Sequence, residues 1–173
     1  SGVIGAKIKE HDPSRVFWPS SPSSGPDDYA DNWHSDNTGD MHYWTVWHEK
    51  KSFDAYQSIR PRFVSEFGYE AFPSMDKLLS EFGYDSFTSM DTIKTFAEEK
   101  DFNFTSKLME YHQRSPSGNS IILENFSRYF KFPNGFENMV YLSQVQQAIA
   151  IKTAVDYWRF LKPSCYGSLI WQL

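Results

Sequence analysis

Short β-prone stretches that alternate with loops and helical stretches limit the fold of this chain more than any other feature. Turn-forming residues bound each of the four stretches: VFWPSSP at 16–22, MHYWTVW at 41–47, RPRFVSEFG at 60–68 and GSLIWQL at 167–173. Strands separated by helical segments favour βα units and a parallel sheet, because each crossover returns the chain to the same end of the sheet. We therefore expect an α/β fold whose strands end together at one edge of the sheet.

The helical stretches follow the spacing that an amphipathic helix requires. The clearest helix is predicted at 139–162 and ends before Pro163. Shorter helices are predicted at 52–58, at 89–99 and at about 120–130. Along the 139–162 helix, apolar side chains that recur every three or four residues form one continuous stripe: Tyr141, Val145, Ala148, Ile151, Val155 and Trp158. Such a stripe is typical of the face that a helix packs on a core.

Aromatic residues make up 18% of the chain, and many of them stand beside Gly, Pro, Ser, His or Asp. A flat ring covers the C–H face of a pyranose while neighbouring polar groups bind its hydroxyls. This composition indicates a sugar-binding cleft, with an aromatic core and ordinary loops as the alternative. The polar, Gly- and Asp-rich stretch 23–40 has no periodicity and is predicted to be a long loop.

The charge and hydropathy of the chain exclude two classes of partner. The net charge is −5 at pH 7 and no basic patch occurs, so nucleic acid is not expected to bind. No apolar run approaches the ~18 residues that a membrane-spanning helix needs, and residues 1–13 lack the pattern of a signal peptide. The single cysteine, Cys165, cannot form an internal disulfide, which favours a reducing compartment such as the cytoplasm over the lysosome.

Residues 65–94 contain a tandem repeat of 15 residues, in which the segment SEFGY at 65–69 returns at 80–84. Glu66 and Glu81 are therefore equivalent in their immediate sequence. Taken alone, they predict a pair of carboxylates in one site, one active residue with a copy in an inserted loop, or two ordinary surface charges. The stretch before Glu66 has the stronger strand pattern, which favours Glu66 as the residue at a strand end.

Several motifs together resemble β-mannosidases of glycoside hydrolase family 2. DPSRVFWPSSP, GDMHYWTVWH, RPRFVSEFGYEAFPS, MEYHQRSPSGN and GSLIWQL occur in the order and spacing found in that family. The resemblance implies that the chain covers about strands five to eight of a (β/α)8 TIM barrel. Residues 1–173 would then be an incomplete catalytic domain, truncated at both ends. The resemblance also implies a retaining exo-β-mannosidase, which removes terminal non-reducing β-D-mannose from oligosaccharides and glycoproteins.

The same resemblance implies roles for single residues. Glu66 falls on the catalytic nucleophile at the end of the seventh barrel strand, with Glu81 as the alternative if the chain shifts by one repeat. The substrate-binding residues would come from two strand ends: His42, Tyr43, Trp44 and Trp171. Among these, Tyr43 would hydrogen-bond and orient the nucleophile, and Trp171 would form a hydrophobic wall under the sugar. No metal or other cofactor is implied.

A retaining glycosidase needs a second carboxyl group about 5 to 5.5 Å from the nucleophile, which acts as acid and then as base. In family 2 this Glu follows an Asn on an earlier strand, and no Asn-Glu pair occurs in this chain. We therefore predict that the isolated chain has no glycosidase activity. Two alternatives are a non-catalytic carbohydrate-binding remnant, and a family 2 β-galactosidase or β-glucuronidase.

Overall fold

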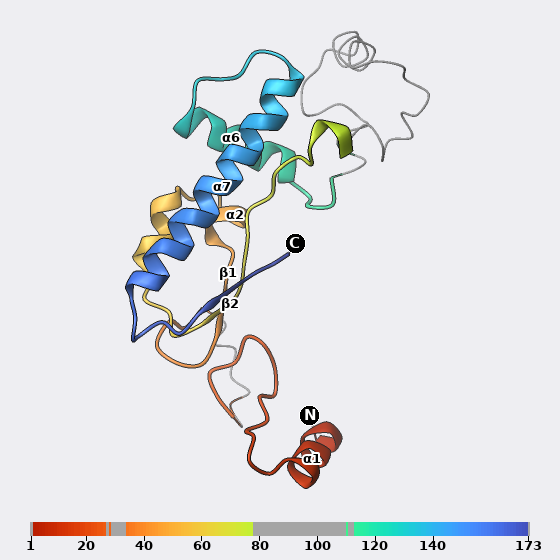
Figure 1. The fold of residues 1–173 in the computed structure, drawn as a ribbon, viewed down its shortest axis with the longest axis vertical. Coiled ribbons are helices and arrows are strands. Elements are labelled where there is room, and N and C mark those ends of the chain that lie inside the picture. Colours follow the sequence, from red (N-terminus) through yellow and green to blue (C-terminus); the bar gives the residue numbers. More distant parts are fainter. Residues whose placement is uncertain (1, 27, 29–33, 78–109, 111–112, 173) are drawn as a thin grey trace. The chain divides into compact units, whose positions relative to one another are not determined.

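The chain forms two compact units in the computed structural model, which describes all residues except 1, 27, 29–33, 78–109, 111–112 and 173 (Figure 1). The first, named the sheet unit, comprises Ser1–Gly68 and Lys152–Leu173. The second, named the helical unit, comprises Tyr69–Ile151. Glu81 and the helix predicted at 89–99 lie outside the described residues.

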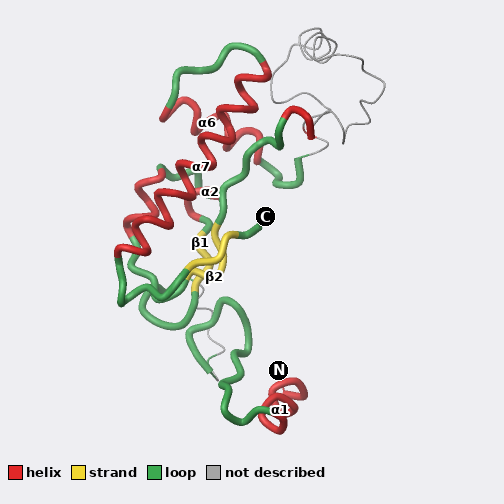
Figure 2. The backbone as a smooth tube through the Cα atoms, viewed as in Figure 1, coloured by secondary structure: helices red, strands yellow, loops and turns green. Residues whose placement is uncertain are grey.

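A three-stranded parallel sheet forms the centre of the sheet unit (Figure 2). Its strands are β1 (Met41–Tyr43), β2 (Val64–Phe67) and β3 (Ser168–Ile170), in the order β1-β2-β3. The parallel pairing confirms the predicted α/β sheet. The (β/α)8 barrel stays a prediction, because parallel strands are common to closed barrels and to open sheets.

The strand predicted at 16–22, the fifth of the implied barrel, is wrong. Residues 16–22 contain no strand, and just beyond them an antiparallel bridge joins Ser23 to Asp40. Pro19 and Pro22 give the physical reason, because proline lacks the N–H group that a sheet ladder needs.

The helices follow the predictions more closely. The sheet unit contains α1 (Gly2–His11), α2 (Thr45–His48) and the 3-10 helix η1 (Phe53–Ser58), and the helical unit contains α6 (Gly118–Tyr129). Helix α7 (Phe136–Phe160) begins in the helical unit and ends in the sheet unit. The helices η1, α6 and α7 confirm those predicted at 52–58, 120–130 and 139–162. Among the described residues, no helix is long and apolar enough to cross a membrane.

Helix α2 replaces the second half of the strand predicted at 41–47. Val46 and Trp47 are neighbours in the sequence, and both are buried. Neighbouring side chains of a strand point to opposite faces, whereas one helical turn can bury both. The burial of this pair therefore favours the helix.

Trp158, near the end of α7, is the centre of an aromatic core in the sheet unit. Its ring meets Phe67 of β2 edge-on, with centroids 4.8 Å apart and an interplanar angle of 81°. It also meets Tyr56 of η1 at 5.7 Å and Tyr43 of β1 at 6.3 Å, again edge-on. The indole Nε1 donates a hydrogen bond to the Tyr56 carbonyl at 3.2 Å, so the polar end of this buried ring is satisfied.

This core determines which faces of β1 and β2 are buried. The buried residues are Met41 and Tyr43 of β1 and Val64 and Phe67 of β2. Two residues, Ser65 and Glu66, separate Val64 from Phe67, and the pairing with β1 shifts at this point. Because β2 has this irregularity, Ser65 and Glu66 are both left half-buried, as is His42 between the two core residues of β1.

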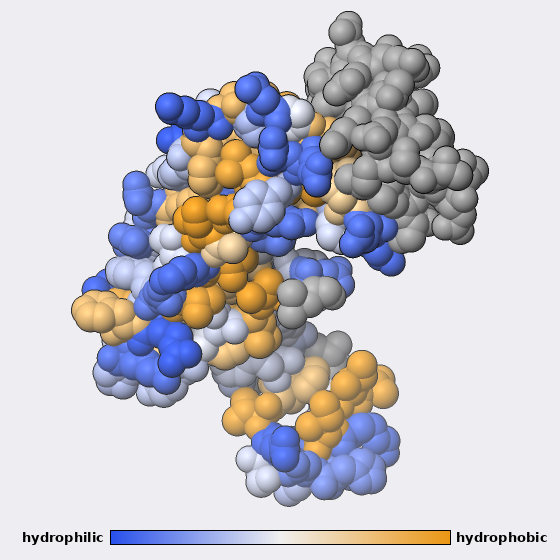
Figure 3. Space-filling view, turned by 45° about the horizontal axis from the view of Figure 1, so that its top comes forward, coloured by the Kyte–Doolittle hydropathy of each residue, from blue (hydrophilic) through white to orange (hydrophobic). Residues whose placement is uncertain are grey.

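The strand β3 lies at an edge of the sheet and is less buried than its apolar sequence predicts. Leu169 is 56% exposed and Ile170 is 39% exposed. Figure 3 shows that hydrophobic residues reach the surface at several other places on one face of the molecule. Among the described residues no strand pairs with the outer edge of β3.

In the helical unit, polar side chains of α7 hold the segment 69–72, which follows β2 directly. Gln147 Nε2 donates to the Tyr69 carbonyl at 2.6 Å, and Gln144 Nε2 donates to the Phe72 carbonyl at 3.1 Å. The Phe72 amide donates to Ser143 Oγ at 3.0 Å. These bonds fix the backbone of a segment that forms no regular structure of its own.

The apolar stripe predicted along α7 is not the face that the helix buries. Of its six residues only Trp158 is buried, and Tyr141 is 67% exposed. The buried residues of α7 coincide with the predicted stripe only at the last position: Phe136, Met139, Val140, Ser143, Gln146, Ala150, Ala154 and Trp158. Two of these are polar because they satisfy groups of neighbouring segments: Gln146 Nε2 donates to the Tyr69 hydroxyl and to the Ile122 carbonyl.

We expect Gln147→Leu to lower the free energy of unfolding by about 1–2 kcal/mol, because the Tyr69 carbonyl loses a short hydrogen bond in a partly buried place. Gln57→Leu, a change of the same chemistry at an exposed position of η1, should alter it by less than about 0.5 kcal/mol. Urea denaturation of the 173-residue chain measures both. Equal stabilities of the two variants would contradict the role given to Gln147.

Candidate active site

Glu66 and His42 face each other across β1 and β2. They are partners in the strand register, and His42 Nδ1 lies 3.2 Å from Glu66 Oε2. Their side chains are 24% and 16% exposed, so both are partly withdrawn from water. A carboxylate in such a place interacts more strongly with a proton-bearing ring than it would at a fully solvated surface.

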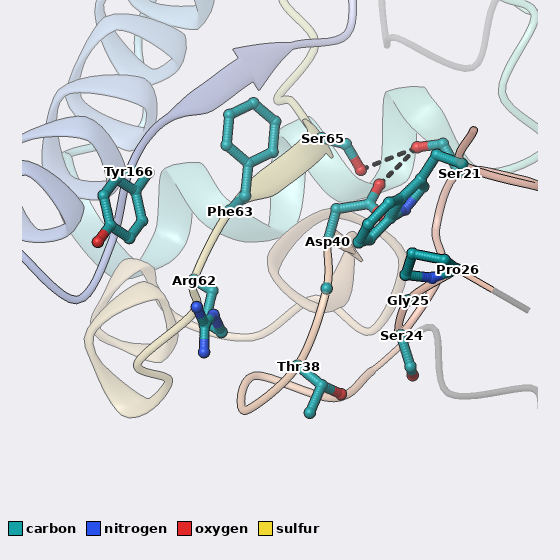
Figure 4. Close-up of a pocket in the computed structure, with 12 residues that line it drawn as sticks. Ser21, Ser24, Gly25, Pro26, Thr38, Asp40, Arg62, Phe63, Ser65 and Tyr166 are labelled. Carbon is teal, nitrogen blue, oxygen red and sulfur yellow. Dashed lines mark hydrogen bonds between the residues drawn. The ribbon is translucent and has the colours of Figure 1, made fainter. Parts of the chain in front are cut away.

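A second acid, Asp40, stands just before β1 and is linked to His42 through Ser21. Figure 4 shows the contacts of Ser21 with Asp40 and Ser65. Ser21 Oγ donates to Asp40 Oδ2 at 2.6 Å, lies 3.3 Å from His42 Nε2, and lies 3.1 Å from Ser65 Oγ. The four side chains therefore form one connected polar network, which also reaches Glu66 through His42.

Several donors hold Asp40 in its ionised form. Burial by itself would raise the pKa of this carboxyl, but hydrogen bonds from Ser21, from Ser65, from the Ser23 amide and from the Trp18 indole outweigh burial and lower the pKa. The Ser23 amide lies 2.8 Å and Trp18 Nε1 3.1 Å from Oδ1. Asp40 is therefore a carboxylate at neutral pH and accepts hydrogen bonds without donating any.

Asp40 lies beside an open hollow of about 700 Å³. Aromatic and polar side chains line it together, among them Trp18, Ser21, Asp40, Arg62, Phe63 and Tyr166 (Figure 4). This mixture is the kind of surface that the aromatic composition predicted for binding a sugar.

The structure does not bring Tyr43 to Glu66. The Tyr43 ring is buried against Trp158 and Tyr56, and its hydroxyl donates to the Ala55 carbonyl at 2.8 Å. The prediction that Tyr43 orients the nucleophile is therefore wrong, because successive side chains of β1 point to opposite faces. His42, the preceding residue, takes the place beside Glu66.

Trp44 and Trp171 meet at Gly68, immediately after β2. A Cβ atom on Gly68 would overlap the carbonyl oxygen of Trp171 and lie 3.1 Å from Cη2 of Trp44. The Trp171 amide in turn donates to the Phe67 carbonyl at 2.9 Å. Trp171 is 53% exposed, so its indole is available to a ligand, and Trp44 is half-buried against His48.

Three residues of this network were not predicted from the sequence: Ser21, Asp40 and Ser65. All three lie in quoted motifs, WPSSP, GDMHYW and RPRFVSEFG, but a single polar residue has no periodicity that reveals its target. Within the described residues, no group of three or more His, Cys, Asp and Glu side chains is arranged to hold a metal ion.

Comparison with known proteins shows what the chain is similar to. It is 30% identical to a β-mannosidase of Capra hircus over 182 residues, which cover 96% of the chain and 19% of that relative. It is 29% identical to β-mannosidase B of Aspergillus terreus, over 99% of the chain and 19% of that relative. It matches the crystal structure of a β-D-mannosidase from Dictyoglomus thermophilum with a TM-score of 0.81 and 34% identity, covering 99% of the chain and 19% of that protein. The chain is homologous to the β-mannosidases.

The resemblance drawn from the motifs is thereby confirmed. No protein-family model matches the chain. This β-mannosidase homologue spans about a fifth of the length of the curated relatives that it matches. Since identity extends over nearly the whole chain, the network around Glu66 lies within the homologous region.

We expect Gly68→Ala to destabilise the sheet unit by about 1–3 kcal/mol, because the new methyl group overlaps backbone that cannot move as a side chain can. Gly25→Ala is the matched control, since a Cβ there meets nothing within 4 Å. Urea denaturation gives the two free energies of unfolding. If Gly68→Ala is as stable as Gly25→Ala, the close approach of Trp171 to Gly68 is refuted.

Proposed function

We propose that this chain carries the nucleophile of a retaining exo-β-mannosidase and that Glu66 is this residue. The observation that carries the proposal is the pairing of Glu66 with His42 at 3.2 Å, in a chain homologous to β-mannosidases. The aromatic hollow is lined by Ser65, the residue before Glu66, and by Asp40. The substrate class is an oligosaccharide with a terminal non-reducing β-mannose. Glu81 is the alternative nucleophile in the second copy of the repeat.

The chemistry requires a carboxylate at this place. A Glu66 oxygen attacks the anomeric carbon while the bond from that carbon to the leaving oxygen breaks, and a separate acid protonates the leaving oxygen. The carboxylate stabilises the oxocarbenium-like transition state and then forms the glycosyl ester. Water, activated by the same second residue acting as base, releases mannose and regenerates Glu66.

The second carboxyl group is not Asp40. A general acid must hold a proton at the working pH, which requires a raised pKa. The hydrogen bonds to Asp40 lower its pKa, so this residue stays ionised. We propose that the acid/base Glu belongs to a segment outside these 173 residues and that the isolated chain is inactive.

Glu66→Ala in the product of the full-length gene tests the nucleophile. Hydrolysis of an aryl β-mannoside should fall at least about 10³-fold. Added azide should restore cleavage and yield the α-mannosyl azide, because a small anion fits the space left by the carboxylate and attacks the same carbon. Glu49→Ala, which removes an exposed carboxylate of the sheet unit, should retain full activity. Azide rescue of Glu81→Ala instead would move the role to the second copy.

The purified 173-residue chain should not hydrolyse an aryl β-mannoside, β-galactoside or β-glucuronide, because the Asn-Glu pair that carries the acid in family 2 does not occur in the chain. The same three substrates, given to the full-length product, separate mannosidase from the other two activities. Hydrolysis by the isolated chain that disappears in Glu66→Gln would overturn the prediction. A full-length product that binds mannosides without cleaving them would instead support a carbohydrate-binding remnant.

A further inference from the structure

We propose that three side chains, named the Asp40–Ser21–His42 relay, position the nucleophile of this site. Asp40 and Ser21 touch neither Glu66 nor the reacting atoms in this arrangement, so they act through His42 as positioning residues. This inference rests on the proposed role of Glu66, but the hydrogen-bond pattern within the relay can be measured independently of activity.

The Ser21 hydroxyl has a single proton to donate. Three polar atoms surround Ser21 Oγ, and the shortest contact is the 2.6 Å bond to Asp40 Oδ2. A carboxylate only accepts, and hydrogen bonds to an ionised oxygen are the short, strong ones. The Ser21 proton is therefore directed at Asp40, and Ser21 presents a lone pair to His42 Nε2.

The direction of the Ser21–Asp40 hydrogen bond determines which ring nitrogens of His42 carry a proton. Ser21 Oγ can only accept from Nε2, which lies 3.3 Å away, so Nε2 must carry a proton. Nδ1 lies 3.2 Å from Glu66 Oε2, and a carboxylate likewise only accepts. With an acceptor on each side, both ring nitrogens of His42 are donors.

The two bonds fix the plane of the imidazole between strand and loop. His42 then holds Glu66 Oε2 and leaves the other oxygen, Oε1, to attack the sugar. When the glycosyl ester breaks down, a proton at Nδ1 stabilises the carboxylate that returns. Glu66 is bonded to the ring directly and Asp40 is linked to it through Ser21, while Arg62 is the other charged residue that lines the hollow (Figure 4).

Asp40→Asn is the discriminating variant, because an amide can donate to Ser21 where a carboxylate cannot. The Ser21 proton is then released toward His42, and Nε2 changes from donor to acceptor while Nδ1 keeps its proton. Asp54→Asn, at an exposed position of η1, is the matched control.

Nitrogen NMR of the 173-residue chain with labelled histidine measures this change. The His42 signals are assigned by their loss in His42→Gln. We expect a proton on Nε2 in the unaltered chain and in Asp54→Asn, and an unprotonated Nε2 in Asp40→Asn. Ser21→Thr should keep the original pattern because it keeps the hydroxyl, and Ser21→Ala should lose it. An Nε2 signal that is the same in all variants overturns the relay.

Enzyme kinetics of the full-length product are the second test of the relay. They also test it if a variant of the 173-residue chain does not fold. Asp40→Asn should lower kcat for an aryl β-mannoside at least about tenfold, because His42 then holds Glu66 less firmly. Ser21→Thr should recover most of the activity that Ser21→Ala loses. Unchanged kcat in Asp40→Asn, with Glu66→Ala inactive, refutes the relay alone. Full activity of Glu66→Ala refutes the proposed function. The relay is then tested by the NMR signals of His42 alone.

Discussion

The edge-on contact between Trp158 and Phe67 is the interaction on which the rest of the sheet unit depends. The two rings lie 4.8 Å apart and join the end of α7 to β2. Once Phe67 is committed to this core, the preceding residue must leave the core, because a strand alternates its faces. Glu66 is thereby turned away from the helix, and the position of the candidate nucleophile follows from the burial of its neighbour.

The same core gives β1 its orientation. Tyr43 packs against Trp158, so His42 emerges on the opposite face, level with Glu66 in the register. The irregularity in β2 adds Ser65 to the half-buried residues beside them. Three polar side chains from two strands are thus collected on one face by the packing of aromatic residues on the other.

The loop before β1 completes this polar face. Asp40 receives hydrogen bonds from Ser21, from Trp18 and from the Ser23 backbone, so one carboxylate ties residues 18–23 to the start of the strand. The segment 16–22, which was predicted to be a strand, instead supplies hydrogen-bond donors to Asp40. Its two prolines exclude it from the ladder and leave its serines available for side-chain contacts.

The sequence by itself determined three strands of a parallel sheet, the helices η1, α6 and α7, the end of α7 before Pro163 and the homology to β-mannosidases, because periodicity and motifs are local. Local patterns could not decide which of two neighbours, His42 or Tyr43, would meet Glu66, since a strand can present either face. Nor could they show that α7 buries Ser143 and Gln146 instead of Tyr141, because those polar residues bond to other segments of the helical unit. Both outcomes required the tertiary structure, in which burial and hydrogen-bond partners come from residues distant in the chain.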